Sequence, residues 1–201
     1  MMRIYKNIII CFVLLSISWM NTNIYNNSSG VTISVLSSDI YNTNLLFELN
    51  DYELISIDDS DEKYLIHIDN STSILQLGKP NLPKVSTSII IPDDLNMEIE
   101  ILSAEYEEIN NILIAPSKGN LSRNVNPEMI EYSFGKVYEK DAFYPGDLSE
   151  LGNPYIVKNI RGQGVIFYPV QYNPLSQTVR IYNKIEVKTV SINDLFEERN
   201  L

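Results

Sequence analysis

The chain has 201 residues, 44% of them hydrophobic, which is enough for one domain that folds without a metal or a disulfide. Its formal net charge of −11 disfavours binding to nucleic acids and to anionic membrane surfaces, because both depend on clustered lysine and arginine. β-branched and aromatic residues, including 13 tyrosines, are abundant, and this composition favours strands over helices.

The first 20 residues predict a secretory signal peptide. Arg3 and Lys6 form a basic lead, the run Ile8–Ile17 is apolar, and a polar segment follows. This run is too short to span a bilayer comfortably, so we expect no stable membrane span and a secreted or periplasmic protein; the alternative is retention as a short anchor. Cys11, the only cysteine, lies in the run, so the exported chain is expected to contain neither a disulfide nor a thiol nucleophile.

The patterns divide the chain into a signal peptide at 1–20, a polar lead at 21–30, one β-sandwich domain at 31–190 and a tail at 191–201. Alternation of apolar and polar residues predicts strands over Val31–Leu36 and Tyr64–Ile68. His67 is the only histidine, and the alternation places it on the polar face of the second of these strands. We therefore expect His67 to be an ordinary surface residue.

The middle of the chain combines turn signals with one ambiguous segment. Gly78–Pro83 predicts a turn, and Met97–Ile101 alternates as a strand. Residues spaced like one face of a helix follow among glutamates: Leu102, Tyr106, Ile109 and Leu113. Glutamate favours a helix here, but the apolar run at 112–115 is equally typical of a buried strand. The pattern leaves both alternatives open.

Loops and one long strand dominate the remainder. Residues 115–164 hold six of the eight glycines and four of the nine prolines, which predicts long loops with short strands among them. In the strand that follows, one face is lined by residues of a single parity: Val179, Ile181, Ile185, Val187 and Thr189. Asn183 interrupts this face and indicates a β-bulge. One all-β antiparallel sandwich accounts for the whole pattern.

No catalytic constellation stands out. With one histidine, and with Cys11 confined to the predicted leader, neither a Cys–His dyad nor a histidine-based zinc site can be assembled. Gly162–Gly164 lacks the third glycine and the following helix of a nucleotide-binding loop. A Ser–Lys or paired-carboxylate mechanism remains open on composition, but no spacing singles out its residues. We therefore expect a non-catalytic binding or structural module with no cofactor and no metal.

The segment Ile112–Pro127 opens a series of collinear motifs, which continues as follows: Tyr144–Gly146, Val157–Gly162, Pro169–Pro174 and Val179–Tyr182. Together with the turn at Gly78–Pro83, these motifs resemble the N-terminal propeptides of gingipains, the Arg-specific cysteine peptidases of bacteria, over roughly residues 78–190. The resemblance implies an antiparallel β-sandwich that assists folding of the peptidase, keeps it latent and is removed by cleavage. It also favours strands on both sides of Glu105–Asn110.

The resemblance further implies an inhibitory loop that binds the peptidase: Lys118, Gly119, Asn120, Leu121, Ser122, Arg123 and Asn124. Arg123 matches the residue that the family places in the primary specificity pocket, and Lys118 is the fallback anchor. An Arg-specific pocket must offer acceptors to a planar guanidinium, whose fork of donors lysine does not reproduce. Arg161, beside Gly162, is expected to support a turn rather than to contact a partner.

The partner that the resemblance implies is the catalytic domain of a gingipain-type cysteine peptidase, in cis if the chain is a fragment of a precursor and in trans otherwise. The alternative is a secreted β-sandwich binding module for carbohydrate or a cell surface, without a peptidase partner. Tyrosine-rich strands suit stacking on sugars. An adjacent reading frame that encodes a Cys–His peptidase would favour the prodomain over this module.

Overall fold

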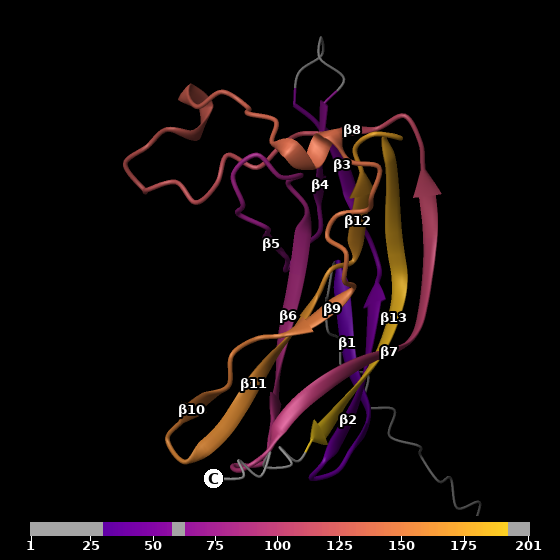
Figure 1. Cartoon of the computed structure of the whole chain (residues 1–201), viewed down its shortest axis with the longest axis vertical. Helices are drawn as coiled ribbons and strands as arrows, with labels where there is room; N and C mark the ends of the chain where they lie inside the picture. The colour runs from indigo at the N-terminus through magenta and orange to yellow at the C-terminus, as the bar shows by residue number, and fades with distance from the viewer. Residues whose placement is uncertain (1–29, 58–62, 193–201) are drawn as a thin grey trace, which may run out of the picture.

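The computed structural model describes residues 30–57 and 63–192 as an all-β molecule built from three sheets (Figure 1). The predicted signal peptide, most of the polar lead and most of the tail lie outside these residues, as do residues 58–62. Within the described part of the chain, no helix is long and apolar enough to cross a membrane.

The first sheet contains the long C-terminal strand at its centre. Its members are β1 (Val31–Ser38), β2 (Asn42–Leu49), β7 (Asn96–Ile109), β12 (Val170–Asn173) and β13 (Thr178–Ile192). Strand β13 pairs antiparallel with β2, β7 and β12, and β1 extends the sheet beyond β2.

The second sheet forms the layer opposite the first, and two of its strands are long. Its members are β5 (Thr72–Ser73), β6 (Pro83–Ile90), β9 (Ser149–Leu151), β10 (Tyr155–Val157) and β11 (Ile160–Phe167). Strand β11 pairs antiparallel with β6, β9 and β10. At one end, β10 and the start of β11 form a hairpin that extends beyond β9 (Figure 1).

A small third sheet closes the other end of the molecule. It contains β3 (Glu53–Ser56), β4 (Lys63–His67) and β8 (Leu113–Ile114). Strands β4 and β8 are parallel, in contrast to the antiparallel pairing elsewhere among the named strands. His67 lies at the exposed end of β4, as expected from the alternation.

The core lies between the two large sheets, as expected for a sandwich. Phe47 of β2 stacks on Phe167 of β11, with ring centroids 5.3 Å apart, and both side chains are fully buried. The predicted inner face of β13 is also buried: Val179, Ile181, Ile185, Val187 and Thr189. A register shift between Tyr182 and Lys184 confirms the bulge at Asn183.

The ambiguous segment is a strand, so the helical alternative is wrong. Strand β7 runs to Ile109 and pairs with β13 along nearly its whole length. Alternation along the strand, interrupted by two register shifts against β13, decides which residues reach the core: Met97, Ile99, Ala104 and Ile109 pack against it, whereas Leu102 and Tyr106 are exposed. The apparent helical spacing therefore joined residues from different faces.

Long loops occupy much of residues 115–148, as the glycine and proline content predicts. Two short 3₁₀ helices interrupt them, at Pro127–Met129 and Lys136–Glu139. Residues 118–134, here called the projecting loop, extend sideways from the end of the molecule near β8 (Figure 1, upper left). This loop contains every residue of the predicted inhibitory segment.

Candidate functional site

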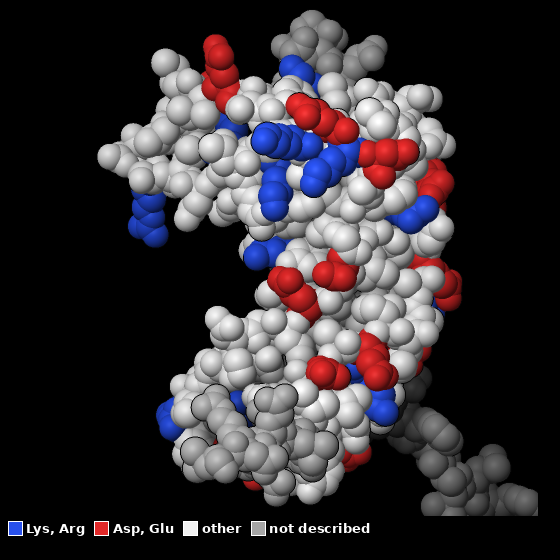
Figure 2. Space-filling view, in the orientation of Figure 1, with Lys and Arg blue, Asp and Glu red and all other residues white. Residues whose placement is uncertain are grey.

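The projecting loop and the β10–β11 hairpin extend from the same side of the molecule, at its two ends (Figure 1). Between them the surface is hollowed, so that the molecule has the outline of a bracket (Figure 2). In the view of Figure 2, basic side chains gather around the upper end, and acidic side chains lie at the waist of the hollow. The molecule therefore has a concave face between its two ends.

The base of the projecting loop is closed by the turn that contains Gly78. The Gly78 N–H donates to the carbonyl of Ser117 at 3.0 Å, where the chain enters the loop. The carbonyl of Gly78 accepts from the N–H of Gly135 at 2.8 Å, where the chain leaves it. The N–H of Ser117 also donates to the carbonyl of Lys79. One residue thus holds both ends of the loop, and we call this arrangement the neck.

The neck requires glycine on both sides. Gly78 has φ of +76°, a region that side chains disfavour, and a Cβ on Gly135 would lie 2.8 Å from the carbonyl oxygen of Gly78. Such contacts are too short for real Cβ atoms, so any larger residue at Gly135 must push the two segments apart. The neck therefore depends on close approach of two backbones.

Lys118 is held inside the loop. Its Nζ donates to the carbonyl of Pro127 at 2.8 Å and lies 4.2 Å from the ring centroid of Tyr132. These contacts connect the first residue of the loop to its middle and its end. The predicted fallback anchor therefore has an internal role, and its ammonium group must leave these contacts before it can reach a partner.

Arg123 lies at a turn in the outer part of the loop. The N–H of Val125 donates to the carbonyl of Ser122 at 3.0 Å, which places Arg123 and Asn124 at the two central positions of the turn. Arg123 is exposed, and its side chain forms no hydrogen bond or ion pair with the residues that the structure describes. Its guanidinium is thus available to a partner.

The other predicted loop residues connect Lys118 to this turn. Gly119 has φ of +78°, and its N–H donates to the Ser117 hydroxyl at 3.2 Å. Asn120 is exposed, and Leu121 is partly buried. Among the seven predicted residues, Lys118 has its side chain held within the loop, by Pro127 and Tyr132.

The return from the loop is anchored on Tyr138, which is partly buried against the core. The Tyr138 hydroxyl donates to the carbonyl of Ile114 at 2.8 Å, and the ring of Phe134 packs edge-on against Tyr138. Burial raises the pKa of the Tyr138 phenol well above its usual value, and the neighbouring phenol of Tyr172 adds to the shift. The proton on Tyr138 is therefore retained at neutral pH, when it is needed for this hydrogen bond.

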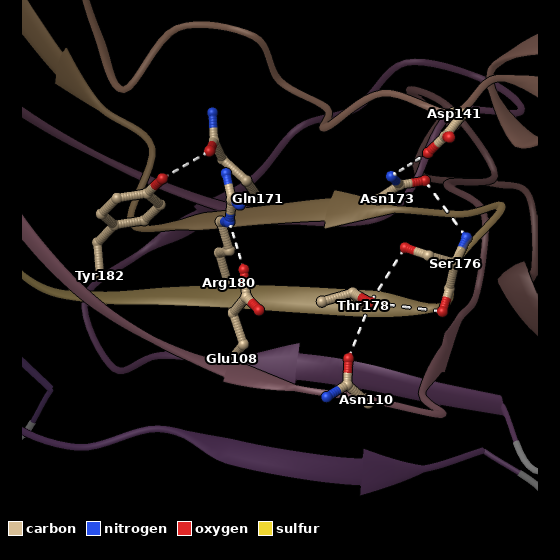
Figure 3. Close-up of polar contacts among 9 residues, drawn as sticks. All are labelled: Glu108, Asn110, Asp141, Gln171, Asn173, Ser176, Thr178, Arg180 and Tyr182. Carbon is tan, nitrogen blue, oxygen red and sulfur yellow. Dashed lines mark hydrogen bonds and ion pairs between the residues drawn. The ribbon is translucent and has the colours of Figure 1, made fainter.

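A polar network on β12 and β13 holds the chain after the second 3₁₀ helix (Figure 3). Asn173 donates to the carboxylate of Asp141 at 2.8 Å. On the neighbouring strands, Arg180 donates to Glu108 at 2.8 Å, and its guanidinium lies 3.7 Å from the ring centroid of Phe143. The network fixes residues 141–143 to the sandwich, so the loop and its supports are continuous with the core.

His67 lies at the surface beside a carboxylate. Its Nε2 lies 3.2 Å from the Asp69 carboxylate, and both side chains are about half exposed. Among the described residues, no group of three histidine, cysteine, aspartate or glutamate side chains could hold a metal ion. Arg161, in contrast, supports the connection between β6 and β7, because its Nη1 donates to the carbonyls of Pro92 and Leu95 at 2.7 Å.

Comparison with known proteins agrees with this architecture. The family model described as Propeptide_C25 matches residues 20–198. The chain belongs to this propeptide family. The match also confirms the resemblance that the sequence motifs carry, and it assigns the chain to a class of non-catalytic domains.

The relatives are gingipains of Porphyromonas gingivalis. Gingipain R1 is 40% identical over 126 residues, which are 63% of this chain and 12% of the relative. Gingipain R2 is 43% identical over 115 residues, which are 57% of this chain and 16% of the relative. The chain thus spans less than a fifth of the length of these proteins.

Two solved structures share the fold. A chain in the complex of the P. gingivalis RgpB pro- and mature domains is 33% identical, with a TM-score of 0.76 over 80% of this chain and 85% of that chain. A structure that addresses the zymogenic latency of P. gingivalis gingipain K is 16% identical, with a TM-score of 0.66 over 83% of this chain and 94% of that chain. The predicted all-β prodomain fold is confirmed.

Proposed function

We propose that this propeptide domain assists the folding of an Arg-specific cysteine peptidase of the gingipain type and keeps it inactive, through a loop that places Arg123 in the specificity pocket. The observation that carries the proposal is the exposed Arg123 on a turn of the projecting loop, whose base is closed at Gly78. The likeness to a prodomain solved in complex with a mature domain supports it. The propeptide domain acts in cis where the peptidase follows on the same chain, and in trans otherwise.

The physical basis is a pre-formed loop. A loop whose two ends are already joined loses less conformational entropy on binding than a free peptide substrate does. The guanidinium of Arg123 provides paired donors for carboxylate and carbonyl acceptors in a pocket that selects arginine. The same features that recognise a substrate arginine thus bind the prodomain, while the neck holds the chain in a fixed conformation. Export of the chain to the periplasm or beyond remains part of this proposal.

The test measures inhibition of mature gingipain R2 by the full chain and by Arg123→Ala. Loss of one partner of a buried charge pair costs about 2–5 kcal/mol, so the inhibition constant of the variant should rise at least about 30-fold. Arg123→Lys keeps the charge without the planar fork of donors. Its inhibition constant should lie between those of the parent and Arg123→Ala. Absence of inhibition by the parent chain at micromolar concentration would instead favour the β-sandwich binding module without a peptidase partner.

Lys118→Met separates the two candidate anchors. Because Lys118 is bound to Pro127 within the loop, its replacement should loosen the loop and weaken inhibition by less than Arg123→Ala does. We expect a rise of about tenfold or less, because the bond is exposed and a typical intramolecular hydrogen bond contributes only about 0.5–1.5 kcal/mol. A larger effect of Lys118→Met than of Arg123→Ala would identify Lys118 as the anchor and contradict the proposed role of Arg123.

A further inference from the structure

The hairpin at the opposite end of the hollow has an unusual outer face. The register places Ile90, Gly162 and Tyr155 in one row across three strands, and Val157 pairs with Ile160 in the next row. Residues directly opposite each other in a sheet share a face. The same face continues along β11 and β6 through the pair of Gly164 and Ser88. The buried Val165 lies on the other face. The row residues therefore lie on the solvent side.

These solvent-side residues are apolar and exposed. The exposed fractions are 75% for Ile90, 58% for Val157, 51% for Ile160 and 40% for Tyr155. Ile156, on the opposite face of the hairpin, is 72% exposed as well, so the hairpin extends beyond the core and the fold itself does not bury its apolar side chains. A contiguous apolar patch on a soluble domain marks a site of interaction. We call the patch formed by these four side chains the apolar arm.

The packing of Tyr155 on Gly162 makes the surface of the arm continuous. A Cβ on Gly162 would lie 2.9 Å from the ring of Tyr155, so the ring lies directly over the glycine backbone. Glycine at this position thus lets Tyr155 cover the hairpin between Ile90 and Val157. Arg161, on the opposite face, braces the hairpin against the carbonyls of residues 92 to 95. The arm is therefore presented by paired strands and an internal brace.

The position of the arm indicates what covers it. It lies at the lower end of the hollow whose upper end is the projecting loop, and both extend from the same side of the molecule (Figures 1 and 2). The end of β13 is also here, because Ile192 pairs with Asn96, the residue that follows the carbonyls held by Arg161. A domain joined to the C-terminal side of β13 would begin at this end of the hollow.

We propose that the apolar arm is a second docking surface, which binds an apolar flank of the same peptidase domain outside its substrate pocket. This inference rests on the proposed function. The loop supplies a charged anchor for the pocket, whereas the arm supplies apolar area that does not require an open active site. Stable interfaces bury about 800 Å² on each partner, and a contact at both ends of the hollow supplies that area more readily than one loop. The arm also remains bound when the pocket is occupied.

The experiment compares binding to mature gingipain R2 in its free form and with its active site blocked by a small covalent inhibitor. The arm variant is Val157→Asp with Ile160→Asp, and the loop variant is Arg123→Ala. Leu175→Asp, at an exposed apolar residue in the turn between β12 and β13, is the matched control. The single variant Ile90→Asp, on a different strand, serves if the double variant lowers the stability of the fold.

The parent and Arg123→Ala should bind the blocked peptidase with equal affinity. The arm variant should bind it at least about tenfold more weakly, because its apolar side chains are no longer present to be buried in the interface. Leu175→Asp should match the parent in both assays. The inference is overturned if the parent inhibits while the arm variants retain full affinity for both forms. It is also overturned if the arm substitutions only convert a dimer of this chain to a monomer. Failure of the parent to bind or inhibit removes the proposed function itself.

Discussion

The two ends of the hollow are built by different physical means. The projecting loop has no strand ladder, and a few backbone bonds at Gly78, one lysine and one partly buried tyrosine hold it. In the hairpin, every residue of β10 pairs with β11, and Arg161 braces the structure from one side. The loop can therefore present one charged side chain on an irregular turn. The hairpin presents a row of apolar side chains with fixed alternation.

This difference in construction determines whether the effect of a substitution stays local. Damage to the neck should release a loop while the sheets remain intact, because the loop contributes little to the buried core. Damage to the brace should reach both large sheets, because the connection between β6 and β7 joins them. The two regions are thus expected to differ in how far a single substitution spreads.

Replacement of Arg161 by methionine should have the largest effect on stability. The Nη1 atom serves three carbonyls, those of Pro92, Asp93 and Leu95, at 2.7 to 3.0 Å. Hydrogen bonds to a charged group contribute about 1.5–3 kcal/mol, so the free energy of unfolding should fall by about 3 kcal/mol. Urea denaturation measures this change, and hydrogen exchange should show faster opening of both β6 and β7.

Lys184→Met is the control for loss of a positive charge. Lys184 lies 3.6 Å from Glu48 on an exposed face, and such pairs contribute about 0–1 kcal/mol. If the two substitutions lowered the free energy of unfolding equally, Arg161 would be an ordinary surface cation and the hairpin would need no brace.

Replacement of Gly135 by alanine should have a smaller effect that is confined to the loop. The residue has φ of −87°, so alanine adopts the backbone conformation freely and the cost comes from the contact with the Gly78 carbonyl. Forced overpacking costs about 1–3 kcal/mol, and we expect about 2 kcal/mol. Limited trypsin digestion should show faster cleavage after Arg123, because the neck no longer restrains the loop.

Gly146→Ala tests whether the effect is specific to the neck. A Cβ at Gly146 would have no atom within 4 Å, so this substitution should change neither the free energy of unfolding nor the rate of cleavage. Equal cleavage rates in the parent, Gly135→Ala and Gly146→Ala would show that the neck does not restrain the loop.

The sandwich could be predicted from the sequence where alternation is strong. Residues of one parity in β13 are all buried, and even the bulge at Asn183 has a visible signal in the interrupted pattern. Strand β7 was ambiguous because glutamates fill its solvent face and also favour helices. Its long pairing with β13 overrides that preference, and pairing of distant segments has no local signature.

The site could be predicted only in part. The family resemblance locates Arg123, and the turn at Gly78 is evident from its glycine and prolines. The contact of Gly78 with Gly135 was missed because two backbones leave no side-chain pattern when they meet. The internal bonds of Lys118 were missed for a related reason: the position of Pro127 and Tyr132 depends on how the loop folds back.

Replacement of Tyr138 by phenylalanine tests the support on the return side of the loop, with the smallest expected effect. At pH 8 the variant loses the hydrogen bond to the Ile114 carbonyl, which should lower the free energy of unfolding by about 1 kcal/mol. Burial raises the pKa of the folded Tyr138 above that of the unfolded phenol, about 10. This phenol therefore stabilises the fold fully below about pH 10, and its contribution declines as the pH rises further, because only the unfolded form ionises.

The parent and Tyr138→Phe should consequently converge at high pH. One pH unit above the pKa of the unfolded phenol, the parent loses about 1.4 kcal/mol that the variant does not lose. Urea denaturation at pH 8 and at pH 11 should therefore show a gap of about 1 kcal/mol that closes or reverses. The other tyrosines titrate in both proteins, so their contributions cancel in the difference. A gap that stays constant would mean that the Tyr138 hydroxyl is freely solvated and does not support the return of the loop to the sandwich.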